Sequence, residues 1–353
     1  MIVAYDARPL QPQTRHWGVG VVVDNLLARL GDRFQFSGIA HRFPGAEQEG
    51  IKTWRRIPYM NTLTFEGSVL FLKKFDIYWG TNDFLPALAQ CPSVVTVHDL
   101  LLLKYPSDQP MTRFFAQRLA SSVKRARRVI TDSRTTADDL IAAFPNVRKK
   151  VEVGLLGVNA IGDASGGDSG AGRASTDSPY VVMLGAHRPR KNLPLAVAAV
   201  SKLRDGGSKL RLVVTGDVDP SFIPLVSGAR EFVSCAGVLP RPSLLALLKG
   251  AVALMFPSFY EGFGFPMLEA MAAGCPVLAL DTPTNREVAG DAAWFLPAEP
   301  CSWSDALAQL GNTNSLQEEM RGRGFGNLPR FSWEKTAAVY ADAFAGLGAN
   351  GRS

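Results

Sequence analysis

The sequence predicts an α/β fold made of two doubly wound domains. Short apolar runs, such as those at residues 2–5 and 93–97, alternate with segments whose apolar residues recur at helical spacing, such as 20–30. This alternation favours parallel sheets covered by helices on both faces. The alternation breaks once, over residues 160–178, and then resumes. A length of 353 residues also suits two domains better than one.

The elements follow from these patterns in chain order. Buried apolar runs predict strands, and apolar residues three or four positions apart predict helices. In the first half we expect strands at 2–5, 34–39, 77–79, 93–97 and 129–131, and helices at 20–30, 113–127 and 135–143. In the second half we expect strands at 180–184, 211–215, 252–256 and 277–280, and helices at 193–202, 243–248, 267–273 and 333–345.

The break defines the domain organisation. Residues 160–178 are rich in Gly, Ser, Ala and Asp, with no large aliphatic side chain after Ile161, so we expect a flexible linker. It separates an N-terminal domain, residues 1–159, from a C-terminal domain, residues 179–330, and residues 331–353 carry the last helical pattern. Two such domains suggest a cleft between them, with ligands at the carboxyl ends of the strands.

Composition excludes several classes of protein. Hydrophobic residues make up 46% and charged residues 20%, which argues against collagen, coiled coils and general disorder. We expect no transmembrane helix, because no apolar run is long enough, and the first residues resemble a buried strand and not a secretory signal. The four cysteines form no CxxC pair, which favours a reducing cytoplasm over a zinc site or a disulfide framework.

Positive charge is concentrated in the first half. Residues 1–160 carry a net charge of +7, and residues 161–353 a net charge of −1. The densest basic segment interleaves two aromatic residues with Arg113, Arg118, Lys124, Arg125, Arg127 and Arg128. Such a helix either presents a solvated face or adsorbs to an anionic membrane, and both interpretations stay open. No recognised nucleic-acid module is present, so we expect no nucleic-acid partner.

Residues 256–280 carry the clearest chemical signal. They read as a strand, a glycine loop and a short helix, with Pro266 suited to the first turn and Gly274 to the position after the last. Gly262 and Gly264 permit close approach of a ligand to the loop, and the following helix N-terminus can bind an anion. Glu261 lies on the loop and Glu269 in the helix. Alone, they would be a solvent-exposed loop charge and a helix-dipole carboxylate.

Together with its surroundings, this stretch resembles the E-x7-E motif of the retaining GT-B glycosyltransferases of family 4. The resemblance extends to GAHRPRKNL at 185–193, VTVHDLLLLKYP at 95–106, RVITDSRTTADDL at 128–140 and EVAGDAAWFLP at 287–297. It implies two Rossmann-like domains facing across a cleft, the first on the acceptor side and the second binding a nucleotide sugar. It also implies that the closing helix, within residues 331–353, packs back on the first domain.

The resemblance assigns roles around the motif. Glu269 would bind the ribose hydroxyls through charge-assisted hydrogen bonds, and Glu261 would lie at the donor sugar. The sugar and diphosphate would meet the N–H groups of Gly262, Phe263, Gly264 and Phe265.

A basic turn, residues 185–192, follows the strand at 180–184. Asn192 suits a helix N-cap and Pro194 the first turn. Fixed cations here would stabilise the charge that develops on a leaving diphosphate, although a solvated basic turn is the alternative. Lys191 matches the lysine of the family's Arg/Lys pair. The arginine usually follows the glycine directly, where this chain has Ala186, so Arg188 or Arg190 would take its place. We favour Arg188 for that role and assign Gly185 and Arg190 to donor binding.

The first half offers further candidates. By the resemblance, a glycine loop with Gly18 and Gly20 contacts the donor phosphate or faces the acceptor, with an ordinary turn as the alternative. His98 would lie by the donor sugar and Asp99 on the acceptor side, with packing or capping as the alternative. Asp217 and Asp219 form a D-x-D pair, but a GT-B enzyme usually needs no metal, so we expect neither a metal nor a cofactor.

The sequence therefore predicts a retaining, metal-independent hexosyltransferase of polysaccharide biosynthesis. It favours mannose from GDP-mannose over UDP-sugars, and a glycan or lipid-linked glycan acceptor. We expect a cytoplasmic enzyme, with peripheral attachment to the inner face of the plasma membrane left open. The alternatives are a GT-B sugar-nucleotide epimerase and a catalytically inactive glycan-binding relative, both disfavoured by the intact Glu261, Glu269 and Lys191.

Overall fold

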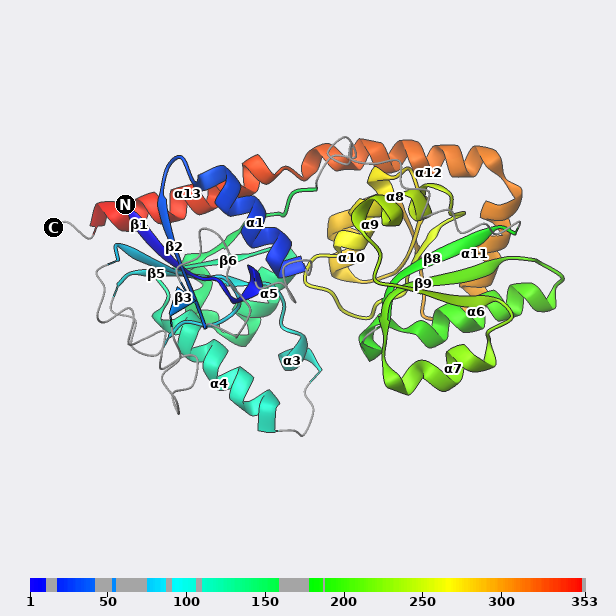
Figure 1. Cartoon of the computed structure of the whole chain (residues 1–353), viewed down its shortest axis with the longest axis horizontal. Coiled ribbons are helices and arrows are strands. Elements are labelled where there is room, and N and C mark those ends of the chain that lie inside the picture. The colour runs from blue at the N-terminus through cyan, green and yellow to red at the C-terminus, as the bar shows by residue number, and fades with distance from the viewer. Residues whose placement is uncertain are drawn as a thin grey trace. The chain divides into compact units, whose positions relative to one another are not determined.

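The computed structural model describes residues 1–10, 18–41, 53–54, 75–86, 91–105, 110–158, 178–186 and 188–350. The chain forms two compact units, residues 1–157 with 331–353, and residues 158–330. Each unit is built around its own parallel sheet (Figure 1). Residues 160–177 of the predicted linker lie outside the described residues, so its flexibility stays a prediction.

The first unit contains a seven-stranded sheet in the order β3-β2-β1-β4-β5-β6-β7. Every strand pair in it is parallel. The strands are β1 (Ile2–Asp6), β2 (Gln35–His41), β3 (Thr53–Trp54), β4 (Ile77–Gly80), β5 (Ser93–Val97), β6 (Arg128–Thr131) and β7 (Val151–Val153). β4 and β5 are buried along their whole length, as expected for central strands of a parallel sheet. Chain order reverses between β1 and β4, which creates a switch point there.

The helices of this unit include the last helix of the chain. They are α1 (Gly18–Leu30), α3 (Leu101–Lys104), α4 (Pro110–Arg125), α5 (Arg134–Ala143) and α13 (Trp333–Asn350), with 3-10 turns η1 (Arg8–Leu10) and η2 (Pro145–Lys150). α5 begins after Ser133, whose side chain accepts the N–H of Thr136 as an N-cap. On α4, Leu119 and Val123 are buried, and the opposite face is exposed.

Helix α13 completes the core of the first unit. It lies beside α1 and also contacts β4 (Figure 1). The ring of Trp79 lies 5.3 Å from that of Tyr340 and 5.9 Å from that of Phe344, centroid to centroid. The Tyr340 hydroxyl lies 2.9 Å from the Thr96 hydroxyl, which also accepts the Trp79 Nε1–H at 3.0 Å. The end of the chain therefore packs against strands near its beginning.

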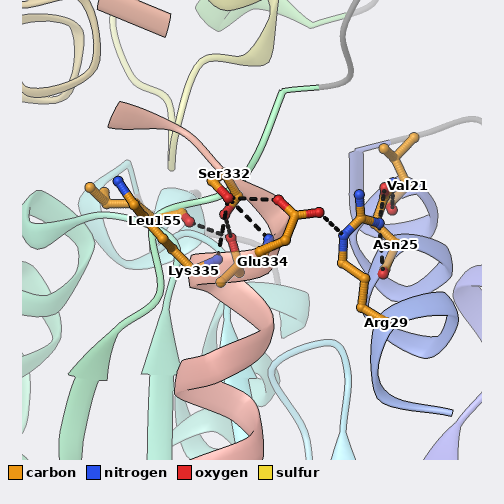
Figure 2. Close-up of polar contacts among 8 residues, drawn as sticks. Val21, Asn25, Arg29, Leu155, Ser332, Glu334 and Lys335 are labelled. Carbon is orange, nitrogen blue, oxygen red and sulfur yellow. Dashed lines mark hydrogen bonds and ion pairs between the residues drawn. The ribbon is translucent and has the colours of Figure 1, made fainter. Parts of the chain in front are cut away.

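Polar contacts fix the start of α13, as Figure 2 shows. Ser332 accepts the backbone N–H of Glu334 at 3.2 Å and donates to its carboxylate at 2.7 Å. Arg29 of α1 reaches the same carboxylate at 2.9 Å (Figure 2). The Ser332 hydroxyl, the Glu334 backbone N–H and Arg29 together lower the pKa of Glu334 to about 2. Because the carboxylate is exposed to solvent, these contacts orient the helix start more than they stabilise the fold.

The second unit contains a six-stranded parallel sheet in the order β10-β9-β8-β11-β12-β13. Its strands are β8 (Tyr180–Ala186), β9 (Arg211–Val218), β10 (Val233–Gly237), β11 (Leu254–Phe256), β12 (Val277–Leu280) and β13 (Ala293–Leu296). Its core gathers buried residues from strands and helices, including Met255, Leu278 and Trp303. Chain order reverses between β8 and β11, so this sheet has its switch point there.

The helices of the second unit connect these strands. They are α6 (Leu193–Asp205), α7 (Ile223–Gly228), α8 (Arg241–Lys249), α9 (Phe265–Ala272), α10 (Pro283–Ala289), α11 (Pro300–Asn312) and α12 (Asn314–Asn327), with 3-10 turns η4 (Pro189–Lys191), η5 (Pro220–Phe222) and η6 (Leu328–Arg330). α9 has Pro266 in its first turn, and Gly274 follows its end with φ +68°, as the sequence predicts. The backbone of Gly274 needs this left-handed conformation to end the helix.

Candidate functional site

The switch point of the second unit brings the basic turn against the glycine loop. The turn follows β8 and the loop follows β11, and these two strands are neighbours in the sheet. Lys191 Nζ lies 2.7 Å from Glu261 Oε1, and Arg190 Nη1 lies 2.7 Å from Glu261 Oε2. Each oxygen of one buried carboxylate therefore has its own cation.

Further contacts lock the turn and the loop together. The Phe259 N–H donates to the Arg190 carbonyl at 2.9 Å, and Arg190 Nη1 donates to the Tyr260 carbonyl at 2.7 Å. Lys191 Nζ lies 5.4 Å from the ring centroid of Phe256, the last residue of β11, a distance suited to a cation–π contact. These contacts hold the Lys191 ammonium group in place, so its position does not depend on a ligand.

Electrostatics keep Glu261 ionised. Burial alone would raise the pKa of its carboxyl, but Lys191 and Arg190 outweigh that effect and hold the pKa below its ordinary value. The charge of the buried Glu261 carboxylate therefore depends on both cations. An anionic ligand that approached this turn would compete with Glu261 for the same cations.

The glycine loop ends at the N-terminus of α9. Gly264 has φ +103°, and a Cβ at this position would lie 2.9 Å from the Met267 side chain. Glycine is therefore favoured here by the backbone conformation, whereas the short contact is with the flexible end of the Met267 side chain, which can shift. Phe265 is the first residue of α9, and its ring lies 5.3 Å from that of Phe263, centroid to centroid.

Glu269 lies further along α9, with 23% of its side chain exposed. Burial raises the pKa of its carboxyl, and the nearby charge of Arg241 opposes that rise. The Nη1 atom of Arg241, on α8, lies 3.4 Å from Glu269 Oε1. Arg241 thus opposes the effect of burial and favours the ionised form of Glu269.

The remaining residues of the basic turn differ in placement. Arg188 is exposed, and Gly185 has φ +75° where the pairing of β8 with β9 is irregular. Asn192 precedes α6 as expected, but its backbone is left-handed, with φ +57°, and its side chain makes no capping hydrogen bond. The predicted side-chain N-cap is therefore wrong. The left-handed backbone, which asparagine tolerates, connects η4 to α6 instead.

The other candidates, His98, Asp99, Gly18 and Gly20, belong to the first unit. Gly18 is exposed at the first residue of α1, and Gly20 is buried in it. Asp99 accepts the Leu101 N–H at 2.9 Å, just before α3. The roles predicted for these three residues stay predictions.

His98 directly follows β5 and is held from three sides. Its Nδ1 lies 2.6 Å from Asp132 Oδ2, after β6, and its Nε2 lies 2.8 Å from the Thr81 carbonyl, after β4. Its backbone N–H donates to Asp83 Oδ1 at 3.2 Å. Asp83 has a left-handed backbone, with φ +61°, and its own N–H donates to the Thr96 carbonyl at 2.9 Å. Both ring nitrogens of His98 thus contact protein acceptors.

With this geometry established, comparison with known proteins identifies the family. The model of the glycosyl transferases group 1 matches residues 168–325, and that of Glycosyltransferase Family 4 matches residues 18–160. The D-inositol 3-phosphate glycosyltransferase of Actinosynnema mirum is 30% identical over 293 residues, which cover 75% of this chain and 67% of that protein. The chain belongs to glycosyltransferase family 4.

Two further similar proteins agree with this family and with the GT-B fold. The O-antigen chain mannosyltransferase B of Escherichia coli is 26% identical over 288 residues, 76% of this chain and 74% of that protein. The structure of WaaG, a glycosyltransferase involved in lipopolysaccharide biosynthesis, superposes with a TM-score of 0.76 at 14% identity, covering 98% of this chain and 100% of that chain. The chain spans about two thirds of the length of several curated relatives that it matches.

Sequence reasoning missed charged residues of this glycosyltransferase that contact the candidate residues. Asp132 directly follows β6 and Asp83 lies three residues after the end of β4, and a polar residue near the carboxyl end of a parallel strand is a signal that could have found them. The sequence around Arg241 contains no such signal, because Arg241 comes close to Glu269 only when α8 packs beside α9.

The D-x-D pair of this glycosyltransferase belongs to local structure. Asp219 caps η5, accepting the N–H of Ser221 at 3.0 Å and its hydroxyl at 2.7 Å. Among the residues that the structure describes, no group of three His, Cys, Asp or Glu side chains could hold a metal ion. The helices of that same part of the chain include none with the length and apolarity to cross a membrane.

The His98 cluster predicts a pH dependence of stability. Burial alone would lower the pKa of His98, but Asp132 and Asp83 raise it to about 9 from an ordinary 6.5. Its stabilisation is complete below pH 6.5 and is lost as the pH rises through 9. Burial, together with Asp99 and Asp132 and against the opposing charge of His98, raises the pKa of Asp83 from 3.8 to about 7, so ionisation of Asp83 costs stability between those two pH values, mostly below the range in which His98 acts.

We therefore expect the thermal midpoint of the first unit to fall between pH 6.5 and 9, with a loss on the order of 1–3 kcal/mol of unfolding free energy. Differential scanning fluorimetry across this range measures it. His98→Gln should remove most of this dependence of the thermal midpoint on pH. A wild-type thermal midpoint that stays constant or rises between pH 6.5 and 9 contradicts the expectation.

Proposed function

We propose that this glycosyltransferase moves a hexose from a nucleoside diphosphate sugar to a glycan or lipid-linked glycan acceptor, with retention at the anomeric carbon. The observation that carries the proposal is the pair of cations, the buried Lys191 and the partly buried Arg190, on the Glu261 carboxylate at the switch point of the second unit. The glycine loop that holds Glu261 leads into the N-terminus of α9, which suits a diphosphate.

The chemistry needs these cations at the leaving group. The bond between the anomeric carbon and the diphosphate oxygen breaks, and its electron pair leaves with the diphosphate. The acceptor oxygen bonds to the same face of the carbon, and its proton goes to the leaving phosphate oxygen. Lys191 and Arg190 would stabilise the developing negative charge, so we propose that transfer needs no divalent metal. Full turnover in the presence of a chelator supports this part of the proposal, and loss of turnover opposes it.

The other residues would complete the donor site. Glu269, whose ionised form Arg241 favours, would bind the ribose hydroxyls, and Glu261 would meet hydroxyls of the donor sugar. The N–H groups of the loop would meet the sugar and the diphosphate. Arg188, which is exposed, would reach the diphosphate from the basic turn, and His98 would lie by the donor sugar.

Mannose is the sugar that the comparisons favour. The E. coli relative is a mannosyltransferase of the O-antigen chain, which supports mannose as the sugar and a surface glycan as the acceptor. We propose GDP-mannose as the donor. A thermal-shift series with GDP-, UDP- and ADP-sugars tests this choice, because a ligand that binds only the folded protein raises its melting temperature. A melting temperature that rises by several degrees with GDP-mannose alone supports the proposal. A melting temperature that rises only with a UDP- or ADP-sugar contradicts it and identifies a different donor.

A turnover assay tests the reaction itself. We expect radiolabel from GDP-mannose to enter a glycan of a bacterial cell-envelope extract, with the anomeric configuration of the donor retained in the product. An altered free sugar nucleotide without any acceptor would instead indicate an epimerase. Donor binding without any turnover would indicate an inactive glycan-binding relative.

We also propose that α4 attaches the enzyme to the inner face of the plasma membrane. Its solvent face exposes Arg113 and Lys124, with 51% of Phe114 exposed between basic residues. Arg118 lies against Phe114, 5.5 Å from its ring centroid. An exposed aromatic ring among cations suits a surface of anionic lipid headgroups.

Vesicles of phosphatidylglycerol and phosphatidylcholine test this attachment. We expect sedimentation of the wild type with these vesicles and its loss in Arg113→Glu/Lys124→Glu. The matched control is Lys209→Glu/Lys249→Glu, which reverses two exposed lysines of the second unit. Equal sedimentation of both double variants, or none by the wild type, contradicts the attachment.

A further inference from the structure

The ring of His98 belongs to a hydrogen-bond network in which both ring nitrogens already have protein partners, without any substrate. Its ring spans the ends of three neighbouring strands, from the Thr81 carbonyl after β4 to the Asp132 carboxylate after β6. The carbonyl oxygen can only accept, so Nε2 carries a proton. A second proton lies between Nδ1 and Asp132 Oδ2, which are 2.6 Å apart. The pair therefore holds two protons whichever partner carries the second.

That second proton belongs to the ring. Ordinary pKa values are about 6.5 for histidine and about 3.9 for aspartate. Burial raises the pKa of Asp132 and by itself would lower that of His98, but the Asp132 and Asp83 charges raise the pKa of His98 to about 9. The other titratable groups of this cluster are also acids: Asp83 after β4 acts on His98, and Asp99 and Tyr340 interact with Asp132. Two of these are carboxylates, whose charge favours an imidazolium.

Among the residues that the structure describes, Asp132 makes no side-chain hydrogen bond or ion pair other than the one with His98. It is buried, and its Oδ1 accepts no hydrogen bond from the residues that the structure describes. His98 is the basic side chain that its carboxylate contacts. Burying such an ion pair costs desolvation free energy that can equal the attraction between the charges, so the pair by itself is weak evidence for a purely stabilising role.

We propose that Asp132 is a positioning residue that fixes His98 as a permanent imidazolium. His98 then holds the turn after β4 through Thr81 and Asp83, and presents a fixed charge at the carboxyl edge of the sheet. It does not accept the proton of the acceptor hydroxyl during transfer. This inference rests on the proposed function for its role in catalysis, but the charge state of His98 is independent of any donor or acceptor.

NMR on the full-length protein, labelled with 13C at the histidine Cε1 atoms, measures that charge state. The chain has four histidines, and His98→Gln assigns the signal of interest. We expect His98 to stay protonated through pH 8 in the wild type and to titrate near 9. In Asp132→Asn we expect its midpoint to fall by more than about one pH unit. Asp138→Asn, which changes an exposed aspartate of α5, should leave it unchanged.

Two outcomes overturn the inference: a wild-type His98 that is neutral at pH 8, or the same midpoint in the wild type and Asp132→Asn. If Asp132→Asn does not fold, the wild-type titration and that of Asp132→Glu, which keeps the carboxylate and should keep the high midpoint, still decide the charge state of His98.

A pH profile of donor turnover then tests the catalytic role. Asp132→Asn should lose turnover by about tenfold or more between pH 6 and 8, as a histidine with an ordinary pKa deprotonates. An unchanged profile removes that role without affecting the NMR result.

Discussion

Lys191→Ala should lower kcat by about 10²- to 10³-fold, the usual loss when one preorganised donor to a developing charge is removed. Lys191 is 7% exposed, and its ammonium group is fixed by Glu261 at 2.7 Å and by the ring of Phe256. Because the group is already in position, it stabilises the leaving diphosphate with little reorganisation. Turnover of radiolabelled donor with cell-envelope extract measures the effect.

Two further variants separate the charge of Lys191 from its packing. Lys191→Met keeps the apolar stem without the charge and should lose as much kcat as the alanine variant. Lys202→Ala removes an exposed lysine of α6 and should retain wild-type turnover. Wild-type kcat in Lys191→Met would remove Lys191 from the mechanism, and a melting curve shows whether each variant is folded.

Trp79→Ala should destabilise the first unit by about 3–5 kcal/mol, because it removes one of the largest buried side chains of the protein. The indole packs against the rings of Tyr340 and Phe344 of α13, and its N–H donates to the Thr96 hydroxyl. The substitution therefore leaves a cavity and weakens the attachment of α13 at the same time.

Chemical denaturation measures the effect of Trp79→Ala on the unfolding free energy. Phe114→Ala is the matched control in the same unit, since 51% of Phe114 is exposed, and its cost should stay below about 1 kcal/mol. Trp79→Phe should recover part of the loss by refilling the cavity. Equal stability of Trp79→Ala and the control would contradict the packing described for α13.

Most interior elements could be predicted from local sequence. β4, β5 and β12 are buried along their length, and their continuous apolar runs identify them. The four strands that sequence analysis did not predict are β3, β7, β10 and β13, and these form the two edges of each sheet. β7 and β10 are only partly buried, and neither has a continuous apolar run. An edge strand has a single partner in the sheet and is less buried, so its sequence carries a weaker apolar signal.

The glycine loop, its two glutamates and the basic turn are likewise local features. The left-handed Gly264, the Pro266 first turn and the Gly274 helix end follow from residue type, because backbone conformation is set by near neighbours. The family resemblance rests on the same continuous stretches. None of these patterns fixes a distance between segments.

The tertiary structure decided which charges meet. Seventy positions separate Lys191 from Glu261, and their contact arises because chain order reverses between β8 and β11, placing the ends of those two strands side by side. The same holds for His98, whose ring partners follow β4 and β6, and for Trp79, whose cover comes from α13. Charge pairing and burial depend on distance in space, and strand order sets that distance.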